Sequence, residues 1–243
     1  MTYVLVHGGG TTGRFWDRLL PLLDGPVLAV DLPGRCDHPA DLGWITVDDE
    51  VASVVADIEG AMPAGPVTLV AHSSGGLVVP GVVAALDERV DQVVLSAALI
   101  PPEGGCGLDC MQPRHAEGLR LAADAANADG NPIIFPAPTD PEALRKTYGG
   151  DPLDDATLAF VFDPVRSVAD TVHHYFQPVH WSTAASVPVT YILNERDRPI
   201  PAALQDEMLP RLPRPARRLT LDGGHIPAVT NPGAIAAVLR ELR

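Results

Sequence analysis

Three residues that could together perform nucleophilic catalysis lie in three separate loops of this 243-residue chain. They are Ser73, Asp197 and His225, in that order along the sequence. A serine hydroxyl is a weak nucleophile at neutral pH and needs an adjacent base, which an imidazole can supply. A carboxylate then holds the imidazole in the right tautomer and stabilises it when it becomes charged. The three residue types therefore predict a catalytic triad with Ser73 as nucleophile, His225 as base and Asp197 as acid.

Ser73 lies where a predicted strand turns into a predicted helix. An apolar, strand-like run covers 66–71, and an apolar, helix-like run covers 76–86. A serine in such a turn, with small residues two places away on either side, is typical of a nucleophile elbow. Only Ser73 fits, since placing Ser74 at the tip would put His72 where a small residue is needed. Ala71 replaces the first glycine of the usual pattern, and a Ser-Ser-Gly-Gly run alone also fits a plain polar turn.

A tetrahedral intermediate of acyl transfer needs two N–H donors aimed at its oxyanion. The residue after the nucleophile, Ser74, would give one. The glycine loop after the first predicted strand would give the other, with Gly9 as first choice and Gly10 as second. This loop has neither the G-x-G-x-x-G spacing nor the lysine of a phosphate-binding loop, so nucleotide binding is disfavoured.

Five residues are the candidates for substrate contacts. Gly8 and Gly10 belong to the glycine loop, His72 and Ile226 adjoin the predicted nucleophile and base, and Trp181 is an aromatic residue of the central segment. His72, like His7, also fits a role in packing and loop bonding.

Several other residues compete for these roles. Glu195, two residues before Asp197, could be the triad acid, whereas Asp222 is too close to His225 along the loop to be a comfortable partner. Asp163 is a weaker alternative acid. The neighbouring pair at 173–174 resembles a metal site only superficially, because adjacent helical residues do not face the same way. No metal site is therefore predicted.

The elements that must position these residues alternate between strand and helix. Short apolar runs predict strands at 2–6, 27–30, 66–71, 92–97, 187–193 and 216–221, and helical patterns cover 14–23, 46–62, 76–86, 201–212 and 231–242. Such alternation predicts an α/β fold with a mostly parallel sheet of about six strands flanked by helices. Ligands bind such sheets at the carboxyl ends of the strands, so the glycine loop and the three catalytic candidates should face one crevice.

The pattern changes between residues 101 and 186. This segment contains no convincing buried strand and suggests helices at 115–126, 141–148, 154–162 and 165–176. Seven of the twelve aromatic residues lie in it. They could line a substrate pocket under a helical lid, or form the small core that any helical insertion needs. The predicted organisation is a core of 1–100 and 187–243 with a lid at 101–186.

Composition limits the compartment and the partners. The net charge of −14 disfavours nucleic acid and anionic membrane surfaces. The apolar run at 3–6 is far too short for a signal peptide or a membrane span. Three cysteines, an odd count, fit free thiols in a reducing cytoplasm. We therefore expect a cytoplasmic protein whose partner is a small-molecule substrate; a homodimer is compatible with the sequence, which leaves the oligomeric state open.

Nearly the whole chain resembles the α/β-hydrolase superfamily. It is most similar to the small esterase branch that includes plant methyl-ester esterases, hydroxynitrile lyases and related bacterial hydrolases. The matching segments are 5–9, 29–34 and 71–76, together with Trp16, Asp197, Gly224 and His225. The resemblance implies cofactor-free hydrolysis through an acyl-enzyme. The first two strands of larger members have no counterpart, which implies a minimal six-stranded sheet.

The sequence therefore predicts a serine hydrolase acting on a carboxylic ester, thioester or lactone with an apolar or aromatic group. Two alternatives stay open: a receptor that binds a small ligand without turnover, and a carbon–carbon hydrolase or lyase on the same scaffold. The related lyases place a threonine and a lysine directly after the first-loop histidine and the catalytic histidine. Gly8 and Ile226 occupy those positions here, which favours the hydrolase.

Overall fold

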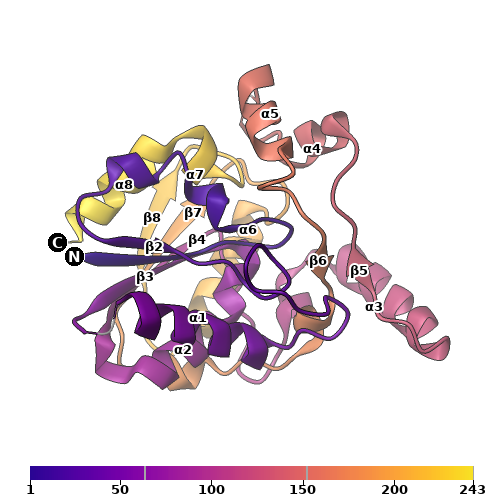
Figure 1. The fold of residues 1–243 in the computed structure, drawn as a ribbon, viewed down its shortest axis with the longest axis horizontal. Helices are drawn as coiled ribbons and strands as arrows, with labels where there is room; N and C mark the ends of the chain where they lie inside the picture. Colours follow the sequence, from indigo (N-terminus) through magenta and orange to yellow (C-terminus); the bar gives the residue numbers. More distant parts are fainter. Residues whose placement is uncertain (63, 152, 243) are drawn as a thin grey trace.

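A six-stranded parallel sheet forms the centre of the molecule (Figure 1). The computed structural model describes residues 1–62, 64–151 and 153–242. The strand order is β2-β1-β3-β4-β7-β8. The strands are β1 (Thr2–Val6), β2 (Val27–Ala29), β3 (Val67–His72), β4 (Val90–Ser96), β7 (Val189–Asn194) and β8 (Arg217–Leu221). All six predicted strands and the predicted fold class are thereby confirmed.

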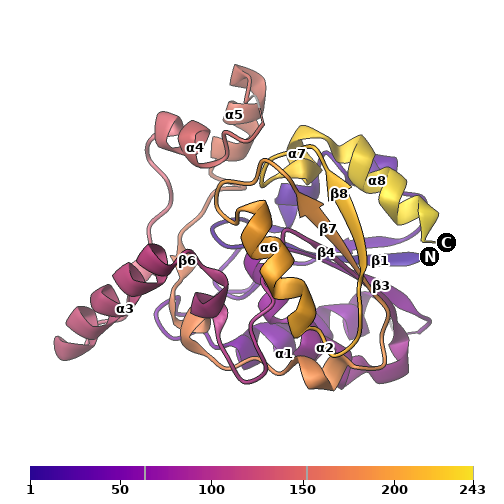
Figure 2. The ribbon, with the colours of Figure 1, turned by 180° about the vertical axis from the view of Figure 1, so that it is seen from behind.

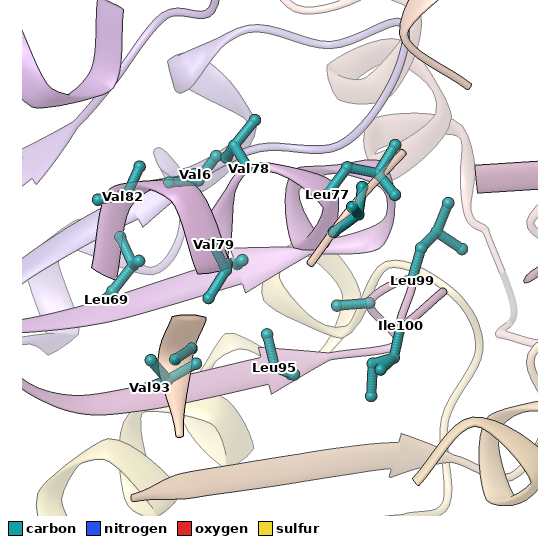
Figure 3. Close-up of a cluster of buried hydrophobic side chains, with 14 of the residues drawn as sticks. Val6, Leu69, Leu77, Val78, Val79, Val82, Val93, Leu95, Leu99 and Ile100 are labelled. Atoms are coloured by element: carbon teal, nitrogen blue, oxygen red, sulfur yellow. The ribbon is translucent and has the colours of Figure 1, made fainter. Parts of the chain in front are cut away.

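The sheet is buried on both faces, as its continuous apolar strands require. Every residue of β3 and β7 is buried, whereas β8 lies at the sheet edge with exposed arginines. On one face, Val4, Leu69 and Leu95 pack against α1 (Val47–Ala61), α2 (Val79–Leu86) and α6 (Ala202–Met208). Figure 3 shows part of this cluster. On the other face, Tyr3 and Val70 pack against α8 (Pro232–Glu241), with α7 (Pro227–Thr230) at the same side.

The pairing of the strands brings the candidate loops to one edge of the sheet. Val6 of β1 lies opposite Ala71 of β3, and Asn194 of β7 lies opposite Leu221 of β8. Because these strands are parallel and in register, the chain leaves all four at the same end. The glycine loop, Ser73, Asp197 and His225 each follow one of these ends.

One predicted core helix is wrong in its form. Residues 14–23 make two short 3-10 turns, Gly13–Trp16 and Leu20–Leu22, instead of a continuous helix. Pro21 lacks the N–H that an α-helix would use there. The apolar residues are nevertheless buried, Trp16 and Leu19 fully.

The chain leaves the sheet between β4 and β7. Three of the four helices expected there are present: α3 (Pro113–Ala128), α4 (Pro141–Thr147) and α5 (Asp155–Phe162). Figure 2 shows α3 projecting from the body, and α4 and α5 lying beyond the strand ends. No helix of the described residues is long and apolar enough to cross a membrane.

The fourth expected helix, at 165–176, is wrong. The chain there forms the short strand β6 (Asp170–Thr171), antiparallel to β5 (Ile134–Phe135), and then a 3-10 turn, His173–Phe176. Its backbone bonds instead to other segments: the N–H of Val168 donates to the carbonyl of Gly10. Tertiary pairing has therefore overridden the local helical pattern.

A buried ion pair joins this turn to α1. Nδ1 of His174 lies 3.0 Å from the Glu50 carboxylate, and both side chains are 1% exposed. Burial alone disfavours a charged imidazole, but the Glu50 carboxylate, with a smaller contribution from Asp170, raises the pKa of His174 above its ordinary value although Arg35 opposes it. The pair therefore stabilises the fold fully below the unfolded-state pKa of histidine, and this contribution is lost as the pH rises through the raised pKa.

We expect Glu50→Gln to destabilise the protein more at pH 6 than at pH 9, because only at the lower pH is His174 charged in the folded state. The difference between the two conditions should be about 1.4 kcal/mol for each unit by which the pKa is raised. Urea unfolding of both proteins at the two pH values measures it. An equal loss of stability at pH 6 and pH 9 would contradict the charged pair.

Candidate active site

The structure brings the three predicted catalytic residues into one hydrogen-bonded chain. Nε2 of His225 lies 3.1 Å from Oγ of Ser73, and Nδ1 of His225 lies 2.7 Å from Oδ2 of Asp197. The Asp197 side chain is fully buried and that of His225 is 6% exposed. The other oxygen of Asp197 accepts a bond of 2.8 Å from the N–H of Ile200. This is the geometry that a base activating a serine, and a carboxylate orienting that base, require.

The competing acids lie elsewhere. Glu195 is exposed, Asp222 pairs with Arg196 at 2.5 Å, and Asp163 pairs with Arg166 at 3.1 Å. Asp197 is the acid in contact with His225.

The turn at Ser73 has a left-handed backbone, with a φ of +51°. Two glycines allow it. A Cβ on Gly8 would lie 2.7 Å from the Cβ of Ser73, and one on Gly75 would lie 2.6 Å from the carbonyl oxygen of His7. Both distances are shorter than real contacts. The small residues of the elbow are therefore a steric requirement, and a further one, Gly8, comes from the glycine loop.

The glycine loop distinguishes between the two candidate oxyanion donors. The N–H of Gly10 already donates to Oδ2 of Asp170 at 2.8 Å. Gly9, the first choice from the sequence, lines the same cavity as Ser73 and stays the predicted donor from this loop. Ser74, the predicted second N–H donor, directly follows Ser73 in the chain and is buried.

The two neighbouring histidines hold loops in place. Nε2 of His7 accepts from the N–H of Leu32 at 3.2 Å, and its Nδ1 donates to the carbonyl of Gly8 at 2.8 Å. Burial, and secondly Arg35, lower the pKa of His7 to about 3, so it stays neutral.

His72 similarly holds the loop that carries His225. Its Nε2 donates to the backbone carbonyl of His225 at 2.8 Å, and Phe15 stacks on its ring at 4.7 Å between centroids. Burial lowers the pKa of His72 well below its ordinary value, and the nearby His225 lowers it further. A neutral His72 can act as this donor without adding charge next to His225.

A cavity of about 610 Å³ opens over Ser73 and His225. Of the predicted substrate contacts, Gly10, His72 and Ile226 line it. Gly8 does not line the cavity; it packs against the Cβ of Ser73.

The expectation that Trp181 contacts substrate is corrected. Trp181 is fully buried in the core cluster that contains α2, and it is absent from the cavity lining. Its 3-10 turn, Trp181–Ala184, packs against α2 on a face of the sheet rather than over the strand ends.

Sequence analysis missed several residues that line the cavity. Phe15 comes from the first 3-10 turn, and Phe135, Tyr148 and Tyr175 come from the insertion. The ring of Tyr148 is nearly parallel to that of His225, at 6.0 Å and 10°. Burial raises the pKa of Tyr148, so its hydroxyl stays protonated. The enrichment of aromatic residues in 101–186 indicates that some of them line a pocket, but it does not indicate which ones.

Asp170 also lines the cavity and was not predicted. Nothing in its local sequence marks it, because its partners lie about 135 to 160 residues away, at Arg35 and Gly10.

The cysteines and the adjacent histidines at 173–174 do not form a metal-binding cluster among the described residues. Among the described residues, no three His, Cys, Asp or Glu side chains are placed to share a metal ion. Cys36, Cys106 and Cys110 are free thiols. His174 faces Glu50, whereas His173 makes an edge-on contact with Trp44, so the two rings have different partners.

Comparisons with known proteins agree with this fold. The model of the alpha/beta hydrolase family matches residues 3–238. The chain is 27% identical over 254 residues to the lipase LipV of Mycobacterium tuberculosis, covering 97% of this chain and 90% of the lipase. It is 27% identical over 262 residues to the pyrethroid hydrolase of Sphingobium wenxiniae, covering 98% and 86%. An extracellular α/β-hydrolase from a Paenibacillus species has the same fold, with a TM-score of 0.83, 20% identity, and coverage of 99% and 98%.

The chain therefore belongs to the α/β-hydrolase family. Plant methylesterases are also among the proteins that it matches, which confirms the resemblance to the small esterases. Its relatives are esterases, lipases and related hydrolases.

We expect Gly8→Ala to lower kcat about 10²-fold, because the added methyl group would push against Ser73 and His72 and displace the hydroxyl from His225. Gly60→Ala is the matched control, since a Cβ on Gly60 meets nothing within 4 Å. Gly60 lies within α1, so its replacement should stabilise the protein by about 0.5–1 kcal/mol. Ester turnover and urea unfolding of the two variants test this. Full activity of Gly8→Ala would contradict the close approach of the glycine loop to Ser73.

Proposed function

We propose that this protein is a serine hydrolase of carboxylic esters that works through an acyl-enzyme on Ser73. The observation that carries the proposal is the continuous chain from Ser73 through His225 to the buried Asp197. Thioesters and lactones contain the same reacting carbonyl and belong to the same proposal. The names of the relatives support ester hydrolysis in general.

In the first half-reaction, Oγ of Ser73 attacks the ester carbonyl and its proton passes to Nε2 of His225. The Asp197 carboxylate stabilises the imidazolium that forms. The oxyanion accepts hydrogen bonds from the N–H groups of Gly9 and Ser74. Collapse of the intermediate breaks the bond to the alcohol, which takes the proton from His225 and leaves Ser73 acylated.

In the second half-reaction, His225 takes a proton from water, and the resulting hydroxide equivalent attacks the acyl carbonyl. The second tetrahedral intermediate uses the same donors. Its collapse releases the carboxylic acid and returns the proton from His225 to Ser73. No cofactor is needed to balance either half-reaction.

The cavity supports an apolar or aromatic substrate. Phe15, Phe135, Leu144 and Val161 contribute hydrocarbon side chains to its wall. Most of these walls come from the insertion, which in this proposal acts as the lid over the reacting carbonyl. Ile226, next to His225, contributes a side chain that cannot act as a proton donor, which disfavours the lyase alternative.

We expect Ser73→Ala to lower the turnover of an activated aryl ester at least about 10³-fold with the fold intact, because among the described residues Ser73 is the hydroxyl that bonds to His225. Ser182→Ala, at an exposed serine outside the cavity, is the control. Steady-state kinetics and circular dichroism of both variants make the test. If Ser73→Ala keeps its activity, the nucleophile is misassigned; a ligand bound tightly by wild type without any turnover would favour the receptor instead.

The charge of the cavity predicts a preference for neutral substrates. Its lining, as far as the described residues go, includes no lysine or arginine, and its single carboxylate, Asp170, is already paired with Arg35. The lining therefore offers no arginine or lysine to pair with an anionic substrate. Burying an unpaired carboxylate of the substrate would cost several kcal/mol. We therefore expect kcat/KM for an aryl butyrate to exceed that for the matching aryl hemisuccinate at least about tenfold, after correction for their rates of alkaline hydrolysis. Equal values would contradict this view of the cavity.

A further inference from the structure

The insertion is bonded to the glycine loop along a continuous stretch. The N–H of Val168 donates to the carbonyl of Gly10 at 3.0 Å, and the N–H of Gly10 donates to Oδ2 of Asp170 at 2.8 Å. Between them, Thr11 and Ser167 form an antiparallel bridge. Both polar backbone groups of Gly10 are therefore held by residues of the insertion.

Arg35 holds the carboxylate that makes this contact. Its guanidinium pairs with Oδ1 of Asp170, and the two side chains are 0% and 2% exposed. The same guanidinium donates to the carbonyl of Thr11 at 3.0 Å and to that of Pro33 at 2.7 Å. Oδ1 of Asp170 also accepts from the N–H of Thr171 at 2.9 Å. The carboxylate is thus fixed on both oxygens, one serving Arg35 and Thr171 and the other serving Gly10.

This arrangement bears directly on the oxyanion hole. Gly10 has a φ of +65°, a conformation that glycine adopts without steric cost, and without a side chain only its peptide bonds can hold it there. A carboxylate near a developing oxyanion would also oppose it, unless the carboxylate is neutralised. Arg35 supplies that neutralising charge while Asp170 holds the N–H of the Gly9–Gly10 peptide. The Gly9 N–H belongs to the peptide before it, whose carbonyl, that of Gly8, accepts bonds from His7 and Thr11. Asp170 therefore holds the one neighbouring peptide that could otherwise turn the Gly9 N–H away from the cavity.

We propose that Asp170 is a positioning residue for the reaction, acting through the peptide of Gly10 to keep the Gly9 N–H aimed at the oxyanion. This inference rests on the proposed function. The insertion therefore does more than cover the cavity, because it supplies a residue that holds the peptide next to the Gly9 N–H. Since Asp170 does not touch the reacting atoms in this proposal, its loss should weaken binding of the transition state and leave substrate binding nearly unchanged.

Two substitutions of Asp170 remove its contacts to different extents. Asp170→Ala removes the acceptor for the Gly10 N–H. Asp170→Asn keeps one acceptor oxygen, which can serve either Gly10 or Arg35 but not both, and so it should be intermediate. Glu50→Gln is the matched control: it also alters a buried ion pair with the 170–176 segment, but its partner His174 is not bonded to the glycine loop by any contact of the described residues.

We expect Asp170→Ala to lower kcat about 10²-fold with KM changed by less than about threefold, the size typical of losing an oxyanion donor. The rate of phosphonylation by a fluorophosphonate, whose adduct carries a tetrahedral oxyanion-like oxygen, should fall by a similar factor. Asp170→Asn should lose about tenfold in both. Glu50→Gln should keep kcat within about twofold of wild type while unfolding at a lower urea concentration.

Two results would overturn the proposal: an Asp170→Ala that loses stability as Glu50→Gln does but keeps kcat, or one whose KM rises while kcat stays the same. If Asp170→Ala does not fold, Asp170→Asn decides, and a kcat within twofold of wild type contradicts the proposal. All measurements use aryl-ester turnover shown to be lost in Ser73→Ala. Turnover that survives Ser73→Ala would instead show that the proposed function fails, whatever Asp170 does.

Discussion

The site depends on one strained turn, in which Ser73 leaves β3 with a backbone that side-chain-bearing residues rarely adopt. Such a conformation costs on the order of 1–3 kcal/mol and persists only where the surroundings impose it. Here the surroundings are tight: Gly8 packs against Ser73, Gly75 packs against the backbone of His7, and the N–H of Leu99 holds the carbonyl of Ser73 at 2.9 Å. The sheet supplies this rigidity, because β3 is its buried third strand and is paired on both sides.

A row of neighbouring aromatic and imidazole rings lies beside that turn. Phe15 stacks on His72, the rings of His72 and His225 are 4.7 Å apart between centroids, and Tyr148 of the insertion stacks on His225 at 6.0 Å. Burial keeps His72 neutral, so His72 can donate a hydrogen bond to the backbone carbonyl of His225 without placing a second positive charge beside the base. On the opposite side, Asp170 and Arg35 connect the insertion to the glycine loop. The insertion thus contacts both the base and the proposed oxyanion hole.

The sequence was sufficient for the parts of the molecule that are encoded locally. Buried strands, the small residues around Ser73 and the glycine loops each have a short-range pattern, and the order of the three catalytic candidates links them. It was insufficient where distant contacts decide. Residues 165–176 have a helical pattern but pair with Gly10 and β5, and Trp181 is an aromatic of the insertion that packs under α2 instead of into the cavity. No local sequence pattern marks Asp170, because the two distant partners of its carboxylate, Gly10 and Arg35, lie in the first 35 residues.

The central claim is that the hydroxyl of Ser73 is the nucleophile activated by His225. Its most direct test is mass spectrometry of the protein after treatment with a fluorophosphonate, with the modified peptide sequenced. We expect one phosphonyl group per chain, located on Ser73, whose formation parallels the loss of ester hydrolysis and is slowed by His225→Ala. Ester hydrolysis that continues in protein fully modified at Ser73, or inactivation with the group on another residue, would contradict it.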